Sequence, residues 1–382
     1  MISGIRKHGR FLVLGAFAVA VAGCLPTTGG NGGGGQTSTT VCGTELTHDL
    51  VLQNDLTCAG PALSTRTPGI TVDLNGHTIT ATSPGSGDGI TGPAVSVKNG
   101  TISGFENGYF ENPNADPATP PFTVDNVHFV NNRTGLLDAG DAVHLTNSTF
   151  DGGHASGSVG LLLGQKVATA ADDVSSNDFV DLDTGVTVSQ WRDSTIAHNT
   201  FSGNNSSVVV NFQTTSIVVS NNDIGGGGTG VLVANENDDL TIENNTVHGG
   251  LVGIWVTSEP GFPNFGSDNN VISGNTVTGN GAAGIAVAAN WAAFTDMLVS
   301  GNTASNNGFS PGSATNAPVG TAPLNDGIYV DVVAGGSVSV ANNHATGNAD
   351  HGIAAFNVTD GHGNTASGNG ATQQCSGSII CS

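Results

Sequence analysis

One short unit recurs along most of the chain: an apolar residue, two further residues, Asn, one residue, and a second apolar residue. Its Asn occupies eight positions in one register: Asn177, Asn199, Asn222, Asn245, Asn275, Asn302, Asn343 and Asn364. Upstream, the same apolar frame occurs without Asn around His77, Gly100, Val127 and Ser148. Between the units stands Gly followed by an apolar-x-apolar segment, as in Gly185-Val186-Thr187-Val188 and Gly253-Ile254-Trp255-Val256.

This pattern predicts an all-β solenoid. Each period supplies two or three short strands of alternating apolar and polar residues, and Gly and Asn form the turns between them. One unit cannot close a core alone, so successive units stack with like residues above like, about 4.8 Å apart. The aligned Asn side chains then form an amide ladder. The frames give about twelve coils.

The opening of the repeat is the most specific part. Cys42-Gly43 leads to Asp55-Leu56-Thr57-Cys58, and then to Asp73-Leu74-Asn75-Gly76-His77-Thr78-Ile79. In these motifs and in its repeat, the chain over residues 42–370 resembles the right-handed parallel β-helix repeat proteins of the pectin-lyase-like superfamily. The resemblance implies a single-stranded right-handed parallel β-helix. That fold hosts lyases, hydrolases, epimerases, adhesins and structural spikes, so function has to be argued from exposed residues.

The N-terminus predicts export. Basic residues precede an apolar run over 11–22, which is too short to span a bilayer and is typical of a signal peptide over residues 1–23. Val21-Ala22-Gly23-Cys24 resembles a bacterial lipobox, which implies lipidation of Cys24 and a membrane-anchored lipoprotein of the outer membrane or cell surface. The alternative is cleavage nearby and a soluble secreted protein. Residues 24–41 are Gly-rich, which predicts a flexible tether.

Export also permits disulfides. Four further cysteines, Cys42, Cys58, Cys375 and Cys381, allow three connectivities. The short-range pairs Cys42–Cys58 and Cys375–Cys381 are favoured because each would close one end, and residues 371–382 would form a C-terminal cap. A metal site at these cysteines is disfavoured, because the chain has no close C-x-x-C spacing.

The net charge of the chain limits the kinds of molecule that it can bind. The full chain has 30 acids and 8 Lys or Arg, three of which lie in the signal peptide, so the exported form carries −25. No Lys or Arg follows Arg192. Phosphate neutralisation needs cations, so nucleic acid is excluded as a partner, and anionic uronates are disfavoured.

One corner of the coil, after the Gly-led strand and before the Asn-led strand, collects rings and carboxylates. Rings stack on sugar faces and carboxylates accept hydrogen bonds from hydroxyls, so the corner predicts a groove for a neutral polysaccharide. The predicted binding residues are Trp191, Arg192, Phe212, Glu236, Phe262, Phe265, Trp291 and Asp296. Three insertions, over 111–121, 258–268 and 307–326, would supply surface loops, and the first two lie at this corner.

Other interpretations of the corner stay open. Aspartate before a strand is a normal turn-former. Stacked acids also repel, so Asp193, Asp238, Asp239 and Asp268 could share Ca²⁺; no other cofactor is implied. Asp193, Asp238 and Asp239 are the candidate catalytic acids for a glycoside hydrolase-like reaction, which needs two carboxyls. A partial T-x-T array resembles ice-binding β-helices, but β-propensity on an exposed strand is the favoured explanation.

Catalysis has little support. The doublets Asp172-Asp173 and Asp238-Asp239 and the segment Gly361-His362-Gly363 depart from the polygalacturonase pattern, because no Asn-Thr-Asp or Arg-Ile-Lys accompanies them. The leading hypothesis is therefore a surface-anchored lipoprotein that binds a neutral polysaccharide. The alternative is a non-catalytic structural or adhesive surface rod.

Overall fold

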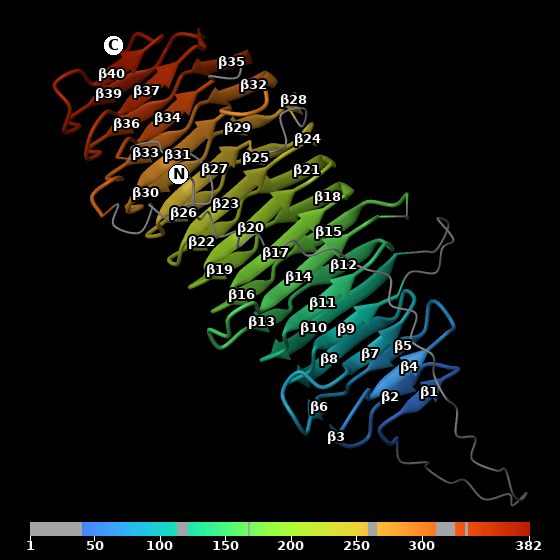
Figure 1. Ribbon diagram of the computed structural model, residues 1–382. Coiled ribbons are helices and arrows are strands. Elements are labelled where there is room, and N and C mark those ends of the chain that lie inside the picture. Colours follow the sequence, from blue (N-terminus) through green and yellow to red (C-terminus); the bar gives the residue numbers. More distant parts are fainter. Residues whose placement is uncertain (1–39, 113–120, 167–168, 259–265, 311–324, 333–334) are drawn as a thin grey trace, which may run out of the picture. The chain divides into compact units, whose positions relative to one another are not determined.

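The computed structural model describes residues 40–112, 121–166, 169–258, 266–310, 325–332 and 335–382 (Figure 1). The chain divides into two units, and all described strands belong to the second, Thr39–Ser382. The predicted signal peptide, Cys24, Phe262, Phe265 and most of each predicted insertion lie outside the described residues.

Sheet A is a ladder of fourteen parallel strands, one from each coil. Each strand pairs with its equivalent in the preceding and following coil, so neighbours in the sheet are distant in sequence. The strands are β1 (Thr44–Leu46), β4 (Leu63–Thr65), β7 (Asp88–Gly92), β9 (Asn107–Glu111), β11 (Thr134–Asp138), β14 (Val159–Gly164), β17 (Thr184–Ser189), β20 (Ser206–Asn211), β23 (Thr229–Ala234), β27 (Val252–Thr257), β31 (Ala283–Ala288), β34 (Ile328–Asp331), β37 (Ile353–Phe356) and β40 (Cys375–Gly377).

Sheet B forms the rest of each coil and has two columns of parallel strands, which β8 and β10 span together. The first column is β2 (Leu50–Val51), β5 (Thr71–Asp73), β8 (Ser96–Ser103), β10 (Phe122–Val130), β12 (Val143–Thr146), β15 (Asp172–Ser175), β18 (Arg192–Ala197), β21 (Thr214–Ser220), β25 (Thr241–Glu243), β29 (Val271–Ser273), β32 (Phe294–Ser300), β35 (Gly336–Ala341) and β38 (Thr359–Asp360), with the short β24 (Asn237–Asp238) and β28 (Ser267–Asp268). The second column continues with β3 (Leu56–Cys58), β6 (Thr78–Ala81), β13 (Thr149–Asp151), β16 (Asp178–Val180), β19 (Thr200–Ser202), β22 (Asp223–Gly225), β26 (Thr246–His248), β30 (Thr276–Thr278), β33 (Thr303–Ser305), β36 (His344–Thr346) and β39 (Thr365–Ser367).

The predicted all-β parallel solenoid is confirmed, but the predicted number of coils is too low. Sheet A has fourteen described strands, one from each coil, where about twelve coils were expected. The frame count began at His77, whereas β1 to β3 form an earlier turn of the solenoid. At the other end β40 lies in the predicted cap and pairs with β37, so the sheet continues beyond residue 370.

The core is built from stacked columns of inward-facing side chains. In the second column of sheet B, Phe129, Phe150, Phe179 and Phe201 lie in register on successive coils. Their rings stack almost parallel, with centroids 4.7 to 4.9 Å apart. Offset or stacked rings at this spacing add about 0.5–1.5 kcal/mol per pair beyond the burial of their area.

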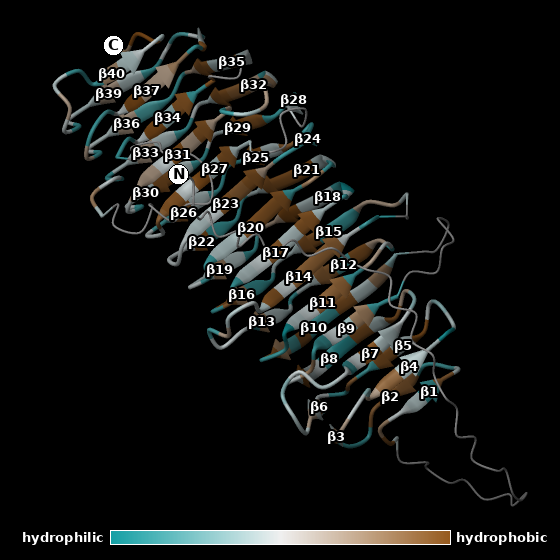
Figure 2. Cartoon of the chain, in the orientation of Figure 1, coloured by the Kyte–Doolittle hydropathy of each residue, from teal (hydrophilic) through white to brown (hydrophobic). Residues whose placement is uncertain are grey.

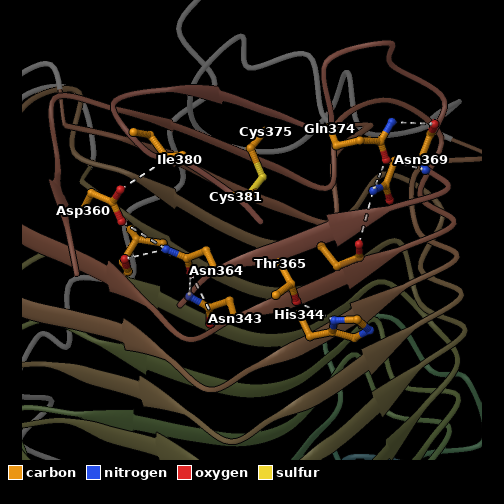
Figure 3. The surroundings of a disulfide bond; sticks show 12 residues. Asn343, His344, Asp360, Asn364, Thr365, Asn369, Gln374, Cys375, Ile380 and Cys381 are labelled. Carbon is orange, nitrogen blue, oxygen red and sulfur yellow. Dashed lines mark hydrogen bonds between the residues drawn. A yellow bond between two sulfur atoms is a disulfide. The ribbon is translucent and has the colours of Figure 1, made fainter. Parts of the chain in front are cut away.

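The predicted Asn ladder is confirmed over all eight positions. The Nδ2 of each of the first seven donates to the Oδ1 of the Asn in the next coil at 2.9 to 3.1 Å. A second ladder, absent from the predictions, runs through Asn280, Asn307, Asn348 and Asn369 at 2.9 to 3.0 Å. Gln374 ends it by accepting from the Asn369 amide (Figure 3).

Both predicted disulfides are present. Cys42 joins Cys58 at the start of the solenoid, and Cys375 joins Cys381 at its end (Figure 3). The last residues are also held by Asp360, whose Oδ2 accepts from the backbone N of Ile380 at 3.1 Å. The first turn and the last residues of the solenoid are therefore each held by a covalent link.

Candidate functional site

The predicted corner forms one continuous column at the junction of sheets A and B. Arg192 lies opposite Thr215, which lies opposite Asp238 in the following coil. The backbone N of Asp268 in turn donates to Asp238 Oδ1 at 2.8 Å. The column places predicted residues of different coils side by side. Arg192, Asp239, Asp268, Asp296 and Trp291 are exposed, whereas Phe212, Glu236 and Asp238 are half-buried.

The prediction that Trp191 lines a groove is wrong. Its side chain is only 1% exposed and packs in the core. Its indole Nε1 donates to Asp172 Oδ2 at 2.6 Å, and Lys166 Nζ lies 5.5 Å from the ring centroid. The left-handed turn at Gln190, with φ of 51°, starts the next strand with this side chain facing inward. An enclosed indole cannot stack on a sugar.

The corner aspartates are largely explained by turn geometry. Asp193, Asp239 and Asp296 have φ of 55°, 54° and 52°, in the left-handed region that Asn and Asp tolerate best among residues with a side chain. Burial raises the pKa of the neighbouring Asp238, and the charges of Asp268 and Glu236 add to this shift.

The four residues predicted to share Ca²⁺ do not converge. Within the described ranges, the side chains whose ligand atoms meet within 4.8 Å are those of Asp326, Asp350 and His351, and none of Asp193, Asp238, Asp239 and Asp268 belongs to that group. Coil stacking explains this, because the turn positions of Asp193 and Asp239 are separated by the intervening coil that carries Ser216.

A buried cluster of acids lies inside the solenoid and was not predicted. Glu111 ends β9 and Asp138 ends β11, and the two are paired in register. They occupy the inward position that Leu163 and Val188 fill in the next coils. Asp141 joins them, and all three side chains are fully buried. No donor reaches Glu111 Oε1, Asp138 Oδ2 or either Asp141 oxygen from the described residues.

Burial dominates the electrostatics of this cluster. It raises the pKa of Glu111 to about 8, and the charge of Asp141 adds to the shift. Burial also raises the pKa of Asp138 well above its usual range, with Glu111 as the next cause, and it raises that of Asp141. The cluster therefore holds protons at neutral pH, and a protonated carboxyl can donate to its neighbour.

Asp172, at the start of β15, is a further buried acid, and it accepts several hydrogen bonds. It accepts from Lys166 Nζ and Trp191 Nε1, each at 2.6 Å, from Val143 N at 2.9 Å and from Ser194 Oγ. The Lys166 and Asp172 side chains are 1% and 0% exposed, so each charge depends on the other. None of these enclosed acids can touch a polymer in solution. They bear on stability.

The signal for this cluster was present in the repeat. In Gly108-Tyr109-Phe110-Glu111 and Gly135-Leu136-Leu137-Asp138, an acid takes the last inward place of the Gly-led segment. Every later Gly-led segment from β14 to β31 has Leu or Val there. Comparing equivalent positions, rather than searching exposed corners, would have found both acids.

An open hollow lies at the opposite edge of sheet A, where strands β14 to β27 begin. Its volume is about 580 Å³, and its polar lining includes His154, Asp183 and Asn205. Leu182 and Leu251 give it apolar walls. Asp183 is held in place, because its two oxygens accept from Asn205 Nδ2 and Gly157 N, each at 3.2 Å. The volume falls within the usual range of ligand sites, roughly 300–1,000 Å³.

Backbone at the hollow approaches the adjacent coil closely. Gly227 has φ of 76°, and a Cβ there would lie 1.7 Å from the carbonyl oxygen of Asn204. Only glycine permits backbone to approach this closely, so the turn at Gly227 stays short. The hollow lies between this short turn and the longer turn that carries His154.

The strands that begin at the hollow present an uncharged outer face. From β14 to β31 no strand of sheet A contains a charged residue or His (Figure 2). Leu162, Thr187, Val209 and Leu232 lie in register on this face and are half-buried. Further along, Trp255, Val252 and Ala286 belong to a second apolar cluster, separate from the core.

Among the described residues, no helical segment has the length and apolar character needed to cross a membrane.

Comparisons with known proteins agree with this architecture. The model of the right handed beta helix region matches residues 135–290 and 261–371. A mutant of the periplasmic alginate epimerase AlgG is similar in structure, with 13% identity, a TM-score of 0.55 and coverage of 85% of this chain and 78% of that one. The A-module of the mannuronan C-5 epimerase AlgE6 of Azotobacter vinelandii gives 15% identity, a TM-score of 0.56 and coverage of 87% and 90%.

At these identities the structural likeness shows a shared fold. No curated protein sequence matches the chain. The matched family region spans 135–371, well over half of the 382 residues. The chain therefore belongs to the right-handed β-helix family.

Proposed function

We propose that this protein is an exported β-helix that binds a neutral polysaccharide at the hollow of His154, Asp183 and Asn205 and along the uncharged outer face of β14 to β23. The observation that carries the proposal is the continuity of the two features. Asp183 directly precedes Thr184 of β17, and Asn205 directly precedes Ser206 of β20. Hydrogen-bonding groups therefore line one edge of an apolar and hydroxylated surface.

The charges favour a neutral ligand. The exported chain has five Lys and Arg residues, and each lies within 4 Å of a carboxylate: Arg66 with Glu45, Lys98 with Asp73, Arg133 with Glu106, Lys166 with Asp172 and Arg192 with Asp193. An anionic polymer would have to compete with these acids. Sugar hydroxyls, in contrast, can bond to Asp183 and Asn205, and the sugar faces can cover Val209 and Leu232.

The similar structures support the class of ligand. Both are named as epimerases of a polysaccharide, alginate or mannuronan. We extend only the class, a polysaccharide, to this chain. Turnover would need paired acids within reach of the ligand, and the exposed Asp239 with the half-buried Asp238 remains the candidate pair from the sequence.

The alternative function is a structural or adhesive surface rod. Two Asn ladders and disulfides at both ends favour it, because these features stabilise stacking without serving a ligand. A rod has no preference among glycans, which distinguishes the two functions.

Affinity electrophoresis in gels that contain neutral glucans, mannans or galactans tests the proposal. Asn205→Ala and Asp183→Asn each remove hydrogen bonds of about 1 kcal/mol, so retardation should weaken about fivefold. The matched control Asp178→Asn changes an exposed acid of β16 on sheet B and should leave retardation unchanged. Trp291→Ala reports separately on the predicted corner, where the ring is 48% exposed.

If no neutral glycan retards the protein, or if the hollow variants behave like the control, the proposed site is wrong. Loss of binding in Trp291→Ala alone would move the site to the corner. Release of reducing ends from a retained glycan would show turnover and would reject the rod.

A further inference from the structure

Asp326, Asp350 and His351 form the one three-residue group in the described chain whose ligand atoms converge within 4.8 Å. Asp326 lies two residues before Ile328 of β34, and His351 takes the equivalent place before β37 in the next coil. The coils are tied there by backbone bonds from Gly327 N to His351 O and from Asp350 N to Asn325 O. Three side chains from two coils thus meet at a fixed junction.

We infer that this junction is a binding site for a divalent transition-metal ion of the Zn²⁺ type. His351 Nδ1 lies 3.2 Å from Asp326 Oδ1 and 3.5 Å from Asp350 Oδ2. Ligands at about 2.0–2.1 Å from a tetrahedral Zn²⁺ are separated by about 3.3 Å, so these distances match the edges of a coordination polyhedron. One imidazole nitrogen and two carboxylates are also a donor set that such ions accept.

Charge and burial support an ion at this place. Asp326 is only 4% exposed, and no Lys or Arg occurs anywhere in residues 193–382 to balance it. Beside it, Asn325 Oδ1 is buried without a hydrogen-bond partner, so a further oxygen lies next to the site in the chain. Asp350 is half exposed, which leaves a path for the ion and a position for water.

The ion would tie β34 to β37 and so stabilise stacking where the insertion before residue 325 interrupts the repeat. This role does not depend on glycan binding. Affinity for metal and for glycan can be measured separately, and failure of one leaves the other unaffected.

The test is isothermal titration of the untagged, EDTA-stripped protein with ZnCl₂ at pH 7.5, with thermal melts at each Zn²⁺ concentration. We expect one saturable site and a melting temperature that rises with Zn²⁺. His351→Gln and Asp350→Asn should each weaken binding at least about tenfold and abolish the rise. Asp350 is exposed, so that variant should fold normally even if changes at buried Asp326 impair folding.

His362→Gln is the matched control, because the His362 ring pairs with Asp360 at 3.7 Å, does not belong to the converging group and is 88% exposed. It should retain wild-type affinity. No saturable site, or equal Zn²⁺ affinity in His351→Gln and wild type, would overturn the inference. Binding of CaCl₂ that survives His351→Gln, without a Zn²⁺ site, would do so too.

Discussion

At the scale of single residues, the protonation of buried Glu111 should affect folding. Its pKa in the folded chain is about 8, against 4.5 in an exposed position, because burial opposes its charge. The folded state therefore binds a proton that the unfolded state has lost between these pH values. The stability from protonated Glu111 is full below about pH 4.5 and declines as pH rises to 8, by up to about 1.4 kcal/mol per unit.

Urea unfolding at pH 5, 6.5 and 8 measures this effect. Wild type should lose free energy of unfolding steadily across the series, with Asp138 and Asp141 adding in the same direction. Glu111→Gln has no charge to bury and should lose less. Glu243→Gln, a half-buried position on the outer side of β25, is the control and should follow wild type. Parallel curves for wild type and Glu111→Gln would show that Glu111 is ionised in the fold.

The individual site residues were the hardest to predict. The sequence indicates which residues share a corner, and Arg192, Asp238 and Asp268 do lie on adjacent coils. It does not indicate on which side of the strand Trp191 lies, because that depends on the φ of 51° at Gln190. A shift of one residue in a strand moves a side chain from the surface to the core.

At the scale of the repeated elements, the Asn ladder should be a major source of stability. Asn222 is buried and makes four side-chain bonds: it accepts from the N and Nδ2 of Asn199, and donates to Ile196 O and Asn245 Oδ1. Asn222→Ala would leave these groups without partners inside the turn. At about 1–3 kcal/mol for each buried unsatisfied group, we expect a loss of at least about 3 kcal/mol in chemical denaturation.

Asn364 provides a matched comparison at the end of the same ladder. It accepts from Asn343 and its Nδ2 donates to Val340 O at 2.9 Å, but among the described residues no Asn of a further coil accepts from it. Asn364→Ala should therefore cost clearly less than Asn222→Ala. Equal losses for the two variants would mean that the ladder adds nothing beyond the bonds within one turn.

The ladder also shows what a repeat makes predictable. Its register follows from the spacing of eight Asn residues, because stacking brings equivalent positions together. The second ladder has an equally visible signal, since Asn280, Asn307, Asn348 and Asn369 each follow a member of the first ladder by the same interval. The total of fourteen strands was not predictable from the Asn frame, because β1 and β40 form without it.

At the scale of the whole molecule, charged side chains are kept away from the central stacked strands of sheet A. Acids stay off the six uncharged strands of sheet A, where like residues would repeat about every 4.8 Å and repel. Among the acids inside the solenoid, Asp172 is paired with Lys166, and burial raises the pKa of Glu111 to about 8, which favours its protonated form. The surplus of acids therefore lies mainly on turns and on sheet B, and keeps the chain far from neutrality.

The N-terminal sequence predicts that Cys24 anchors the protein to a membrane. The motif Val21-Ala22-Gly23-Cys24 resembles a lipobox, and a surplus of negative charge gives the chain no electrostatic attraction to anionic lipids. Membrane retention would then depend on acyl chains alone.

In cell fractionation, wild type should sediment with membranes and Cys24→Ser should appear in the soluble fraction. The variant must keep the cooperative unfolding of wild type, since residues 42–382 are unchanged. Sedimentation of a folded Cys24→Ser with membranes would refute the anchor, and a soluble wild type would indicate ordinary secretion instead.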